Sequence, residues 1–278
     1  MSAKADGQPA RALARLYCPP AQRAVLAALF DIEAQLGAGL ERALEHEVAH
    51  TRLAWWREEC ARLSTAQALH PLTRQLQTHF GDRAHGALAA LSGLVDTAAW
   101  DLAAATFETR RELDAYCERW SAALVAPLAA VALPAAASGL ALALGQALRE
   151  LELLNSLTTD ARHGRIRLPL EELASCGAQP EELAGSRFGA ALAALLQRRH
   201  REARAVLAAR ITALAPSEQT ALRALLVWAT IVMLQSRRVA AALPRATCAG
   251  DHHAPLDGWR AWRAARRAQA GRLLLTGA

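Results

Sequence analysis

The sequence has few of the residues that build β-strands and few that interrupt helices. Valine, isoleucine and threonine are sparse beside alanine and leucine, so strand-favouring residues are too few for several strands. Only 11 prolines and 16 glycines occur among 278 residues, and alanine and leucine favour helices. We therefore predict an almost entirely helical protein that is long enough to bury a substantial core.

Lysine is nearly absent, since Lys4 is the only one and arginine supplies the other basic side chains. The formal net charge is +6, but the arginines are spread among acidic residues on the expected helix faces. This dispersed pattern argues against nucleic acid as a partner. A mildly basic surface still favours anionic lipids or diphosphates as ligands.

Paired cysteines and a secretory signal are also missing. The five cysteines are odd in number, far apart and without a CxxC pair, which is typical of free thiols in a reducing cytoplasm. No apolar run follows the charged residue near the start, unlike a signal peptide. We expect a cytoplasmic protein whose contact with a membrane is at most peripheral, at the inner membrane face.

Residues 120–148 need a separate test because no charge occurs from 121 to 148, a length that could span a bilayer. Alanine makes up much of the stretch, and Pro134 followed by Ala-Ala-Ala-Ser-Gly is typical of a connection between helices. We therefore predict two adjacent buried helices there and no membrane span.

The remaining pattern indicates one domain. We expect residues 1–18 to be disordered or loosely attached and residues 19–278 to form a single helical domain, since no linker is long enough to separate two. Pro19 and Pro20 suit the start of the first helix, and glycines at 37 and 39 should interrupt it. Asp96 and Thr97 are expected to cap a later helix, and Thr109 is a plausible cap for a helix over 110–131.

Residues 160–169 carry the densest set of polar groups that suit a ligand: Asp-Ala-Arg-His-Gly-Arg-Ile-Arg-Leu-Pro. Arg162, Arg165 and Arg167 are candidates for binding a diphosphate or another polar head, because arginine offers forked donors to phosphate. Asp160 is a candidate metal ligand. A magnesium–diphosphate site needs several carboxylates, and one helical turn before Asp160 the sequence has Ser156.

Several segments of the chain together resemble the squalene/phytoene synthase family, especially its short bacterial members. They are Arg-Leu-Ala-Trp-Trp-Arg-Glu-Glu at 52–59 with His-Pro-Leu-Thr-Arg-Gln-Leu at 70–76, Phe-Glu-Thr-Arg-Arg-Glu-Leu-Asp-Ala-Tyr-Cys at 107–117, the 160–169 segment, and Trp-Arg-Ala-Trp-Arg-Ala-Ala-Arg at 259–266. Their order and spacing make the resemblance fairly specific over most of the chain.

The resemblance implies an all-α, isoprenoid-synthase-like helical bundle around a central apolar cavity. The first helix, the 120–148 pair and residues 227–234 would supply the cavity walls. Active members of the family join two prenyl diphosphates head to head, with magnesium held between two Asp-rich motifs. Metal ions and arginines neutralise the departing diphosphate while the cavity excludes water.

This chain departs from the family pattern at the metal site. The paired aspartates of the first motif fall on Gly37 and Ala38, and Ser156 stands for the first aspartate of the second motif. Glu41 and Asp160 remain as the remnant of a metal site, and two acids alone would hold magnesium weakly. Family members without the aspartates include an assembly factor of mitochondrial respiratory complex I.

The resemblance and the missing aspartates together leave two functions open. The first is a family member without ordinary prenyl-coupling activity, which keeps the scaffold to bind an isoprenoid, a lipid or a protein partner. The second is an active transferase of prenyl diphosphates that depends on Mg²⁺ and uses unusual ligands. The missing aspartates favour the first, and residues 160–169 keep the second open.

Overall fold

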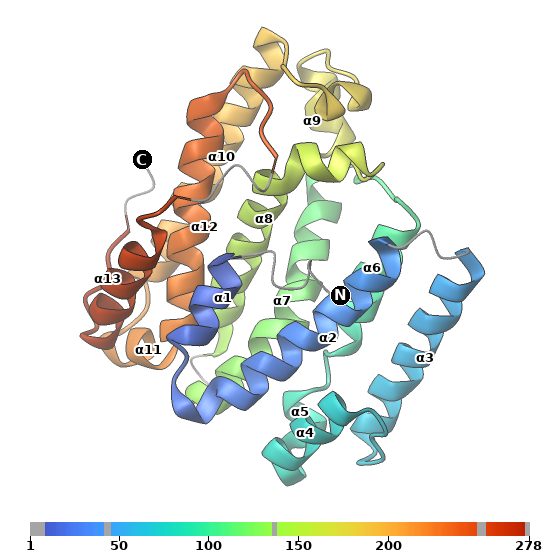
Figure 1. The fold of residues 1–278 in the computed structure, drawn as a ribbon, viewed down its shortest axis with the longest axis vertical. Helices are drawn as coiled ribbons and strands as arrows, with labels where there is room; N and C mark the ends of the chain where they lie inside the picture. The colour runs from blue at the N-terminus through green and yellow to red at the C-terminus, as the bar shows by residue number, and fades with distance from the viewer. Residues whose placement is uncertain (1–8, 42–45, 135–137, 249–253, 276–278) are drawn as a thin grey trace.

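Two long antiparallel helices, α7 (Arg110–Ala132) and α8 (Ser138–Arg162), form the centre of the structure (Figure 1). This computed structural model describes residues 9–41, 46–134, 138–248 and 254–275. Apart from one isolated bridge between Arg187 and Arg245, the described residues contain no β-structure. The all-α fold class predicted from composition is confirmed.

The other helices surround this central pair (Figure 1). In chain order they are α1 (Pro9–Leu16), η1 (Pro20–Gln22), α2 (Arg23–Glu41), α3 (His46–Ser64), α4 (Pro71–Phe80), η2 (Gly81–Arg83), α5 (Ala84–Ala87), α6 (Ser92–Leu102), α9 (Leu170–Ser175), η4 (Pro180–Ala184), α10 (Ala190–Thr212), α11 (Pro216–Ala221), α12 (Arg223–Ala242) and α13 (Asp257–Gln269). On α8 pack α7, α10 and α12, and α13 packs on the outer side of α12.

The uncharged 120–148 stretch is divided as predicted. α7 ends at Ala132, α8 begins at Ser138, and Pro134 lies between them. The two helices approach closely at Gly145, where an added Cβ would lie 2.3 Å from Ser121 Oγ and 2.6 Å from a Val125 methyl carbon. A glycine is therefore required at the point where α8 crosses α7.

The expectation that residues 1–18 are loosely attached is wrong for residues 9–18. α1 packs against α12, and Ala10, Ala14 and Cys18 are buried in the core. The apolar positions 10 and 14 are one helical turn apart, so they lie on one face of α1 and bury it. Residues 1–8 lie outside the described residues.

Two local predictions near helix ends are also corrected. Gly37 does not interrupt α2, which continues to Glu41, because a single glycine costs a helix only about 1 kcal/mol. Asp96 and Thr97 lie inside α6 rather than at its start. The expected N-cap position of Thr109 is confirmed, since α7 begins at Arg110.

Helix α12 is long and apolar enough to cross a membrane, but 67% of the apolar window is buried inside the fold. Its Trp228 is among the largest fully buried side chains, together with Trp120 of α7. This burial is typical of the core helix of a bundle. All five cysteines lie in the described residues, and none of them forms a disulfide.

Candidate functional site

The segment after α8 turns back toward its own helix. The backbone N–H groups of His163 and Arg165 both donate to the Asp160 carbonyl oxygen at 2.9 Å. Gly164 adopts a φ of +78°, a left-handed conformation that glycine adopts without steric cost. This turn returns the Arg165 side chain to the end of α8, where Asp160 lies.

The Asp160 carboxylate is fully engaged by neighbouring side chains. Ser156 Oγ donates to Oδ2 at 2.6 Å, and Arg165 donates to Oδ1 through Nε at 3.1 Å and Nη2 at 2.8 Å. Arg167 Nε lies 3.7 Å from Oδ2. The residue that corresponds to an absent aspartate, Ser156, therefore binds the remaining one, and Asp160 belongs to a local ion-pair cluster.

Arg167 extends this cluster into the interior. Its side chain is only 4% exposed, and Nη1 donates to Asp101 Oδ1 at 2.7 Å. The Tyr116 hydroxyl also donates to Asp101, at 3.2 Å, and burial raises the pKa of Tyr116 to about 12. Burial disfavours the charged guanidinium, but Tyr116, Asp101 and Asp160 outweigh it and raise the pKa of Arg167 above its ordinary value.

Arg162 points to a different place. Its Nε donates to the Ala184 carbonyl at 3.1 Å, and Nη2 donates to the Gly185 carbonyl at 3.4 Å. The structure therefore brings Asp160 together with Arg165 and Arg167, but Arg162 is occupied with the end of η4. A side chain two positions after Asp160 lies on a different face of α8, which explains why Arg162 is separated from Asp160.

The other predicted metal ligand, Glu41, is the last residue of α2, and its side chain lies outside the described part of the structure. Across the described residues, no group of three or more histidine, cysteine, aspartate and glutamate side chains is placed to hold a metal ion. The available donors do not fit the magnesium cluster that the resemblance implies. Gly37 and Ala38 offer no side-chain oxygen, and Asp160 is already paired.

Four charged side chains meet in the interior between α1, α2 and α8. Arg11 of α1 pairs with Glu33 of α2 at 2.5 Å and lies 3.4 Å from Glu152 of α8. Arg149, one turn before Glu152, lies 3.2 Å from it and 4.0 Å from Glu33. We call Arg11, Glu33, Arg149 and Glu152 the interior charge cluster; their side chains are between 6% and 17% exposed.

Two buried indoles complete the cluster. Trp120 Nε1 donates to Glu33 and Trp228 Nε1 donates to Glu152, both at 2.8 Å. The Arg11 guanidinium carbon lies 4.8 Å from the Trp228 ring centroid, a cation–π distance. The helices predicted to line an apolar cavity do surround this region, but charged and indole groups occupy it.

The surroundings of Glu33 and Arg149 keep both the carboxylate and the guanidinium group charged. Burial alone would raise the pKa of Glu33, but Arg11 and Arg149 outweigh it and hold that pKa below its ordinary value. Burial disfavours a charged Arg149, yet Tyr116, Glu152 and Glu33 raise its pKa well above the usual value. Glu33 and Arg149 are thus each stabilised in the charged form by the groups around them.

Sequence reasoning missed this cluster because its members come from helices far apart in the chain. Arg11 lies in the segment that was expected to be loose. Arg149 and Glu152 follow directly on the uncharged stretch and share one face of α8 by their spacing. The signal in the sequence was the pair of opposite charges at Arg149 and Glu152, three residues apart in a helix predicted to be buried.

A sequence model of squalene/phytoene synthases matches residues 5–260, almost the whole chain. The chain belongs to the squalene/phytoene synthase family. No curated protein is detectably similar to it in sequence.

Two solved structures share the fold of this squalene/phytoene synthase family member. A dehydrosqualene synthase in complex with ligand superposes with a TM-score of 0.71 at 17% identity, covering 94% of this chain and 90% of that one. The squalene synthase HpnC from Alicyclobacillus acidocaldarius gives 0.65 at 17% identity, covering 85% and 89%. At these identities the likeness shows a common fold, which confirms the predicted isoprenoid-synthase-like bundle.

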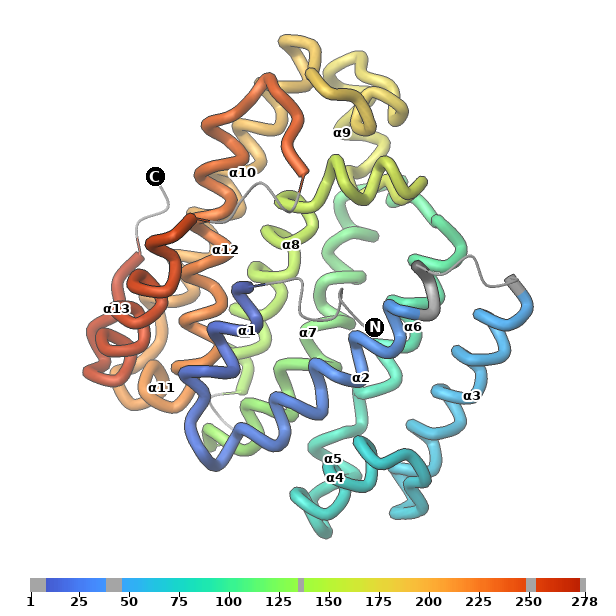
Figure 2. Tube along the Cα trace, in the orientation of Figure 1, coloured from blue at the N-terminus to red at the C-terminus, as the bar shows by residue number. Residues whose placement is uncertain are grey.

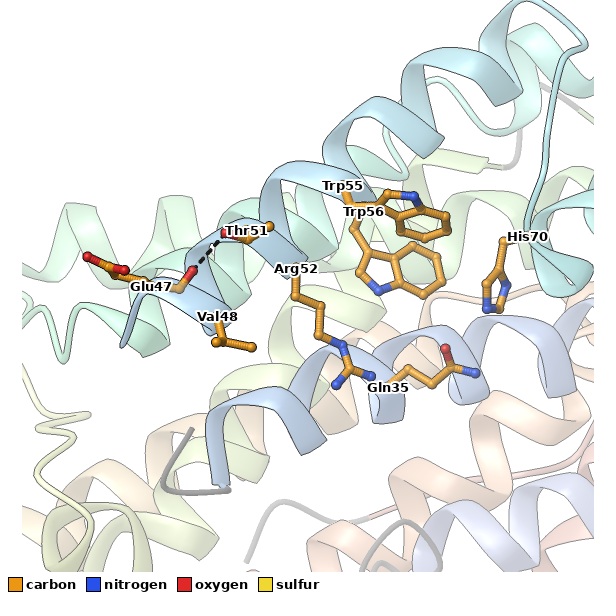
Figure 3. A pocket seen from close by; sticks show the side chains of 8 residues that line it. All are labelled: Gln35, Glu47, Val48, Thr51, Arg52, Trp55, Trp56 and His70. Atoms are coloured by element: carbon orange, nitrogen blue, oxygen red, sulfur yellow. Dashed lines mark hydrogen bonds between the residues drawn. The ribbon is translucent and has the colours of Figure 1, made fainter. Parts of the chain in front are cut away.

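The family member also has an open pocket of about 660 Å³ between α2 and α3 (Figure 3). Helix α3 lines the pocket with Val48, Thr51, Arg52 and Trp55. Residues three or four positions apart share one face of a helix, so these side chains lie on the same side of α3. The two adjacent tryptophans differ in burial, since Trp56 is 2% exposed and Trp55 is 39% exposed.

One end of this pocket is aromatic and the other is polar. The Trp56 ring lies 4.8 Å from the His70 ring and 5.3 Å from the Trp55 ring. Figure 3 shows Arg52 extending from α3 toward α2, where Gln35 lies. Burial lowers the pKa of His70, which keeps it neutral beside the aromatic rings. Arg52 and Glu47 both line the polar end, so the pocket suits an apolar group that carries a polar end.

Proposed function

We propose that this protein binds a ligand or partner on the family scaffold and does not couple prenyl diphosphates. The observation that carries the proposal is the interior charge cluster. A prenyl chain between α7, α8 and α12 would lie against Arg11, Glu33, Arg149 and Glu152. Separating these partners would leave buried charges unpaired, which costs several kcal/mol for each broken pair.

The metal chemistry of the family is the second support. Magnesium bound to a diphosphate would supply charge stabilisation for its departure. Here Ser156 and Arg165 occupy the Asp160 carboxylate, and Gly37 and Ala38 replace the acids of the first motif. No step of the reaction can be assigned to these residues.

The ligand that we propose is an isoprenoid or lipid chain in the pocket between α2 and α3. Trp55, Trp56 and Val48 provide apolar contact, and Arg52 offers forked donors to a polar head. A volume of about 660 Å³ lies within the range of ordinary ligand sites. A protein partner is the second class of binding that the non-catalytic scaffold allows.

The alternative function is a Mg²⁺-dependent prenyl-diphosphate transferase with unusual ligands. Its support is the turn that places Arg165 and Arg167 beside Asp160, two arginines that could meet a diphosphate. Against it, both guanidinium groups already pair with carboxylates. Activity would require these ion pairs to open.

The test combines a turnover assay with a binding assay on the purified protein. We expect no diphosphate release from farnesyl or geranylgeranyl diphosphate above background, with or without Mg²⁺. Native mass spectrometry should show a copurifying lipid or uptake of a prenyl chain, weakened by Trp55→Ala and Arg52→Gln but not by the control Asp160→Asn. Mg²⁺-dependent release would overturn the proposal. An absence of any lipid uptake would leave a protein partner as the remaining class.

A further inference from the structure

Helix α13 (Asp257–Gln269) has two unlike faces. Its inner face buries four alanines and Asp257 against the bundle, chiefly α12. Its outer face exposes Trp259 and Trp262, which are 51% and 49% accessible. Tryptophan exposes a large apolar surface, and single exposed apolar residues are ordinary, but two on one helix face need an explanation.

The charge on this outer face is strongly positive. The helix contains four arginines and one aspartate, a net charge of 4 − 1 = +3. Asp257 is committed to Arg238 and Arg260 on the inner side. Arg263 lies over the Trp259 ring, with its guanidinium carbon 4.5 Å from the ring centroid. The outer face therefore keeps its basic charge beside the two indoles.

The surface continues from α13 onto α1, which lies near it in the fold (Figure 2). Trp262 and Arg266 line a hollow of about 280 Å³ together with Leu16, the last residue of α1. Leu16 is 66% exposed, and Arg23 and Arg223 line the same hollow. We define the α13 surface by the following side chains: Leu16, Trp259, Trp262, Arg263, Arg266 and Arg267.

We propose that the α13 surface docks on an anionic lipid bilayer. Interfacial helices place tryptophan at the level of the head groups and arginine against the lipid phosphates. Both residue types occur here on one face, and an excess of positive charge matches an anionic membrane. Trp259 and Arg266 lie opposite the buried alanines by their helical spacing, so the bundle need not open for docking. This inference is independent of the ligand proposed for the α2–α3 pocket.

The test measures binding of the full chain to vesicles at low ionic strength by flotation. One set contains phosphatidylcholine alone, and the other contains equal parts of phosphatidylcholine and phosphatidylglycerol. We expect at least about tenfold tighter binding to the anionic vesicles. Trp259→Ala with Trp262→Ala should weaken that binding about tenfold.

Neutralising the arginines should have the larger effect. Replacement of Arg263, Arg266 and Arg267 by glutamine should weaken binding to anionic vesicles on the order of a hundredfold, because each arginine contributes roughly a factor of five. Two matched controls lie elsewhere on the surface. Val206→Ala, at an apolar side chain that is 45% exposed, and Arg210→Gln, both on α10, should leave binding unchanged. Far-ultraviolet circular dichroism verifies that every variant folds.

Three results would overturn the proposal. The first is equal affinity for neutral and anionic vesicles, or no binding to either. The second is binding that the α13 variants leave unchanged or that the controls weaken equally. The third is binding of a duplex oligonucleotide or an acidic polypeptide, lost in the same variants, without binding to vesicles.

Discussion

The middle and the end of α8 both carry charges in a largely apolar helix, but they differ in where their partners come from. At the end, Asp160 pairs with Arg165, five residues later, through a glycine turn. In the middle, Arg149 and Glu152 meet Arg11 and Glu33, more than 100 residues away in the chain. The first cluster occupies a position that the family resemblance marks as functional, and the second occupies the expected cavity.

The difference bears on our proposal that the protein does not couple prenyl diphosphates. The Asp160–Arg165 pair is about as buried as Arg11–Glu33, since its side chains are 13% and 19% exposed against 17% for both Arg11 and Glu33. It joins two residues five positions apart in one turn, so opening it does not separate two helices. The interior charge cluster is held by two indole donors and by charges of both signs, and breaking a buried pair is expensive. The middle of α8, whose charges join it to α1 and α2, therefore supports the proposal more strongly than the end.

The largest effect is expected when Glu33 is removed. Glu33→Ala should lower the free energy of unfolding by about 3–5 kcal/mol, because Arg11 and Arg149 would lose a carboxylate in a buried site. The matched control is Asp31→Ala on the same helix, whose pair with Arg15 is 40–45% exposed and should contribute less than about 1 kcal/mol. Urea unfolding compares the two, and equal losses would contradict the account.

A paired replacement in α8 tests whether the cost arises from unpaired charge. Arg149→Leu with Glu152→Leu should destabilise less than either single change, because Arg11 and Glu33 keep each other as partners. The expected coupling between the two positions is about 0.5–3 kcal/mol in a double-mutant cycle. Additive losses would mean that the charges do not act together.

A smaller effect is expected at the end of α8. Asp160→Asn should lower the free energy of unfolding by about 1–2 kcal/mol, because Arg165 and Arg167 lose the charged carboxylate of Asp160. Arg167 keeps Asp101 as its partner. Asp114→Asn is the control, since Asp114 and its partner Arg110 are 45% and 32% exposed, more than Asp160 and Arg165. A loss at Asp160 as large as that of Glu33→Ala would remove the distinction between the two clusters.

The smallest effect is a pH dependence assigned to Glu33. Its pKa is lowered in the folded protein from an ordinary value of 4.5, so its contribution is present above pH 4.5 and is lost as the pH falls through the folded pKa. The stability difference between the wild type and Glu33→Gln should therefore be constant above that value and shrink below it. A difference that grows on acidification would have the wrong sign.

The fold could be predicted from the sequence because its signals are local. The break at Pro134, the cap position of Thr109 and the helical composition each depend on neighbouring residues. The turn at Gly164 and the pairing of Arg165 with Asp160 are local too, so residues 160–169 were identified as a polar site. Which of the arginines reach Asp160 depends on helix phase and on η4, so the separation of Arg162 from Asp160 could not be predicted from local pattern.

The interior charge cluster and the α2–α3 pocket could not be predicted in the same way. The cluster requires four side chains from α1, α2 and α8 to converge, and no spacing within one helix specifies that convergence. The pocket depends on how far α3 stands from α2 beside Gln35, a packing property of the whole bundle. Both features depend on tertiary contacts, and local pattern gives little information about these.

The most direct test of the central claim is a crystal structure of the protein soaked with Mg²⁺ and a non-reactive prenyl diphosphate analogue. We expect Arg11 to stay paired with Glu33 and Arg149 with Glu152, with no prenyl chain between α7, α8 and α12 and no three-metal cluster beside Asp160. A chain threaded through the interior, with three ordered magnesium ions at the end of α8, would contradict it.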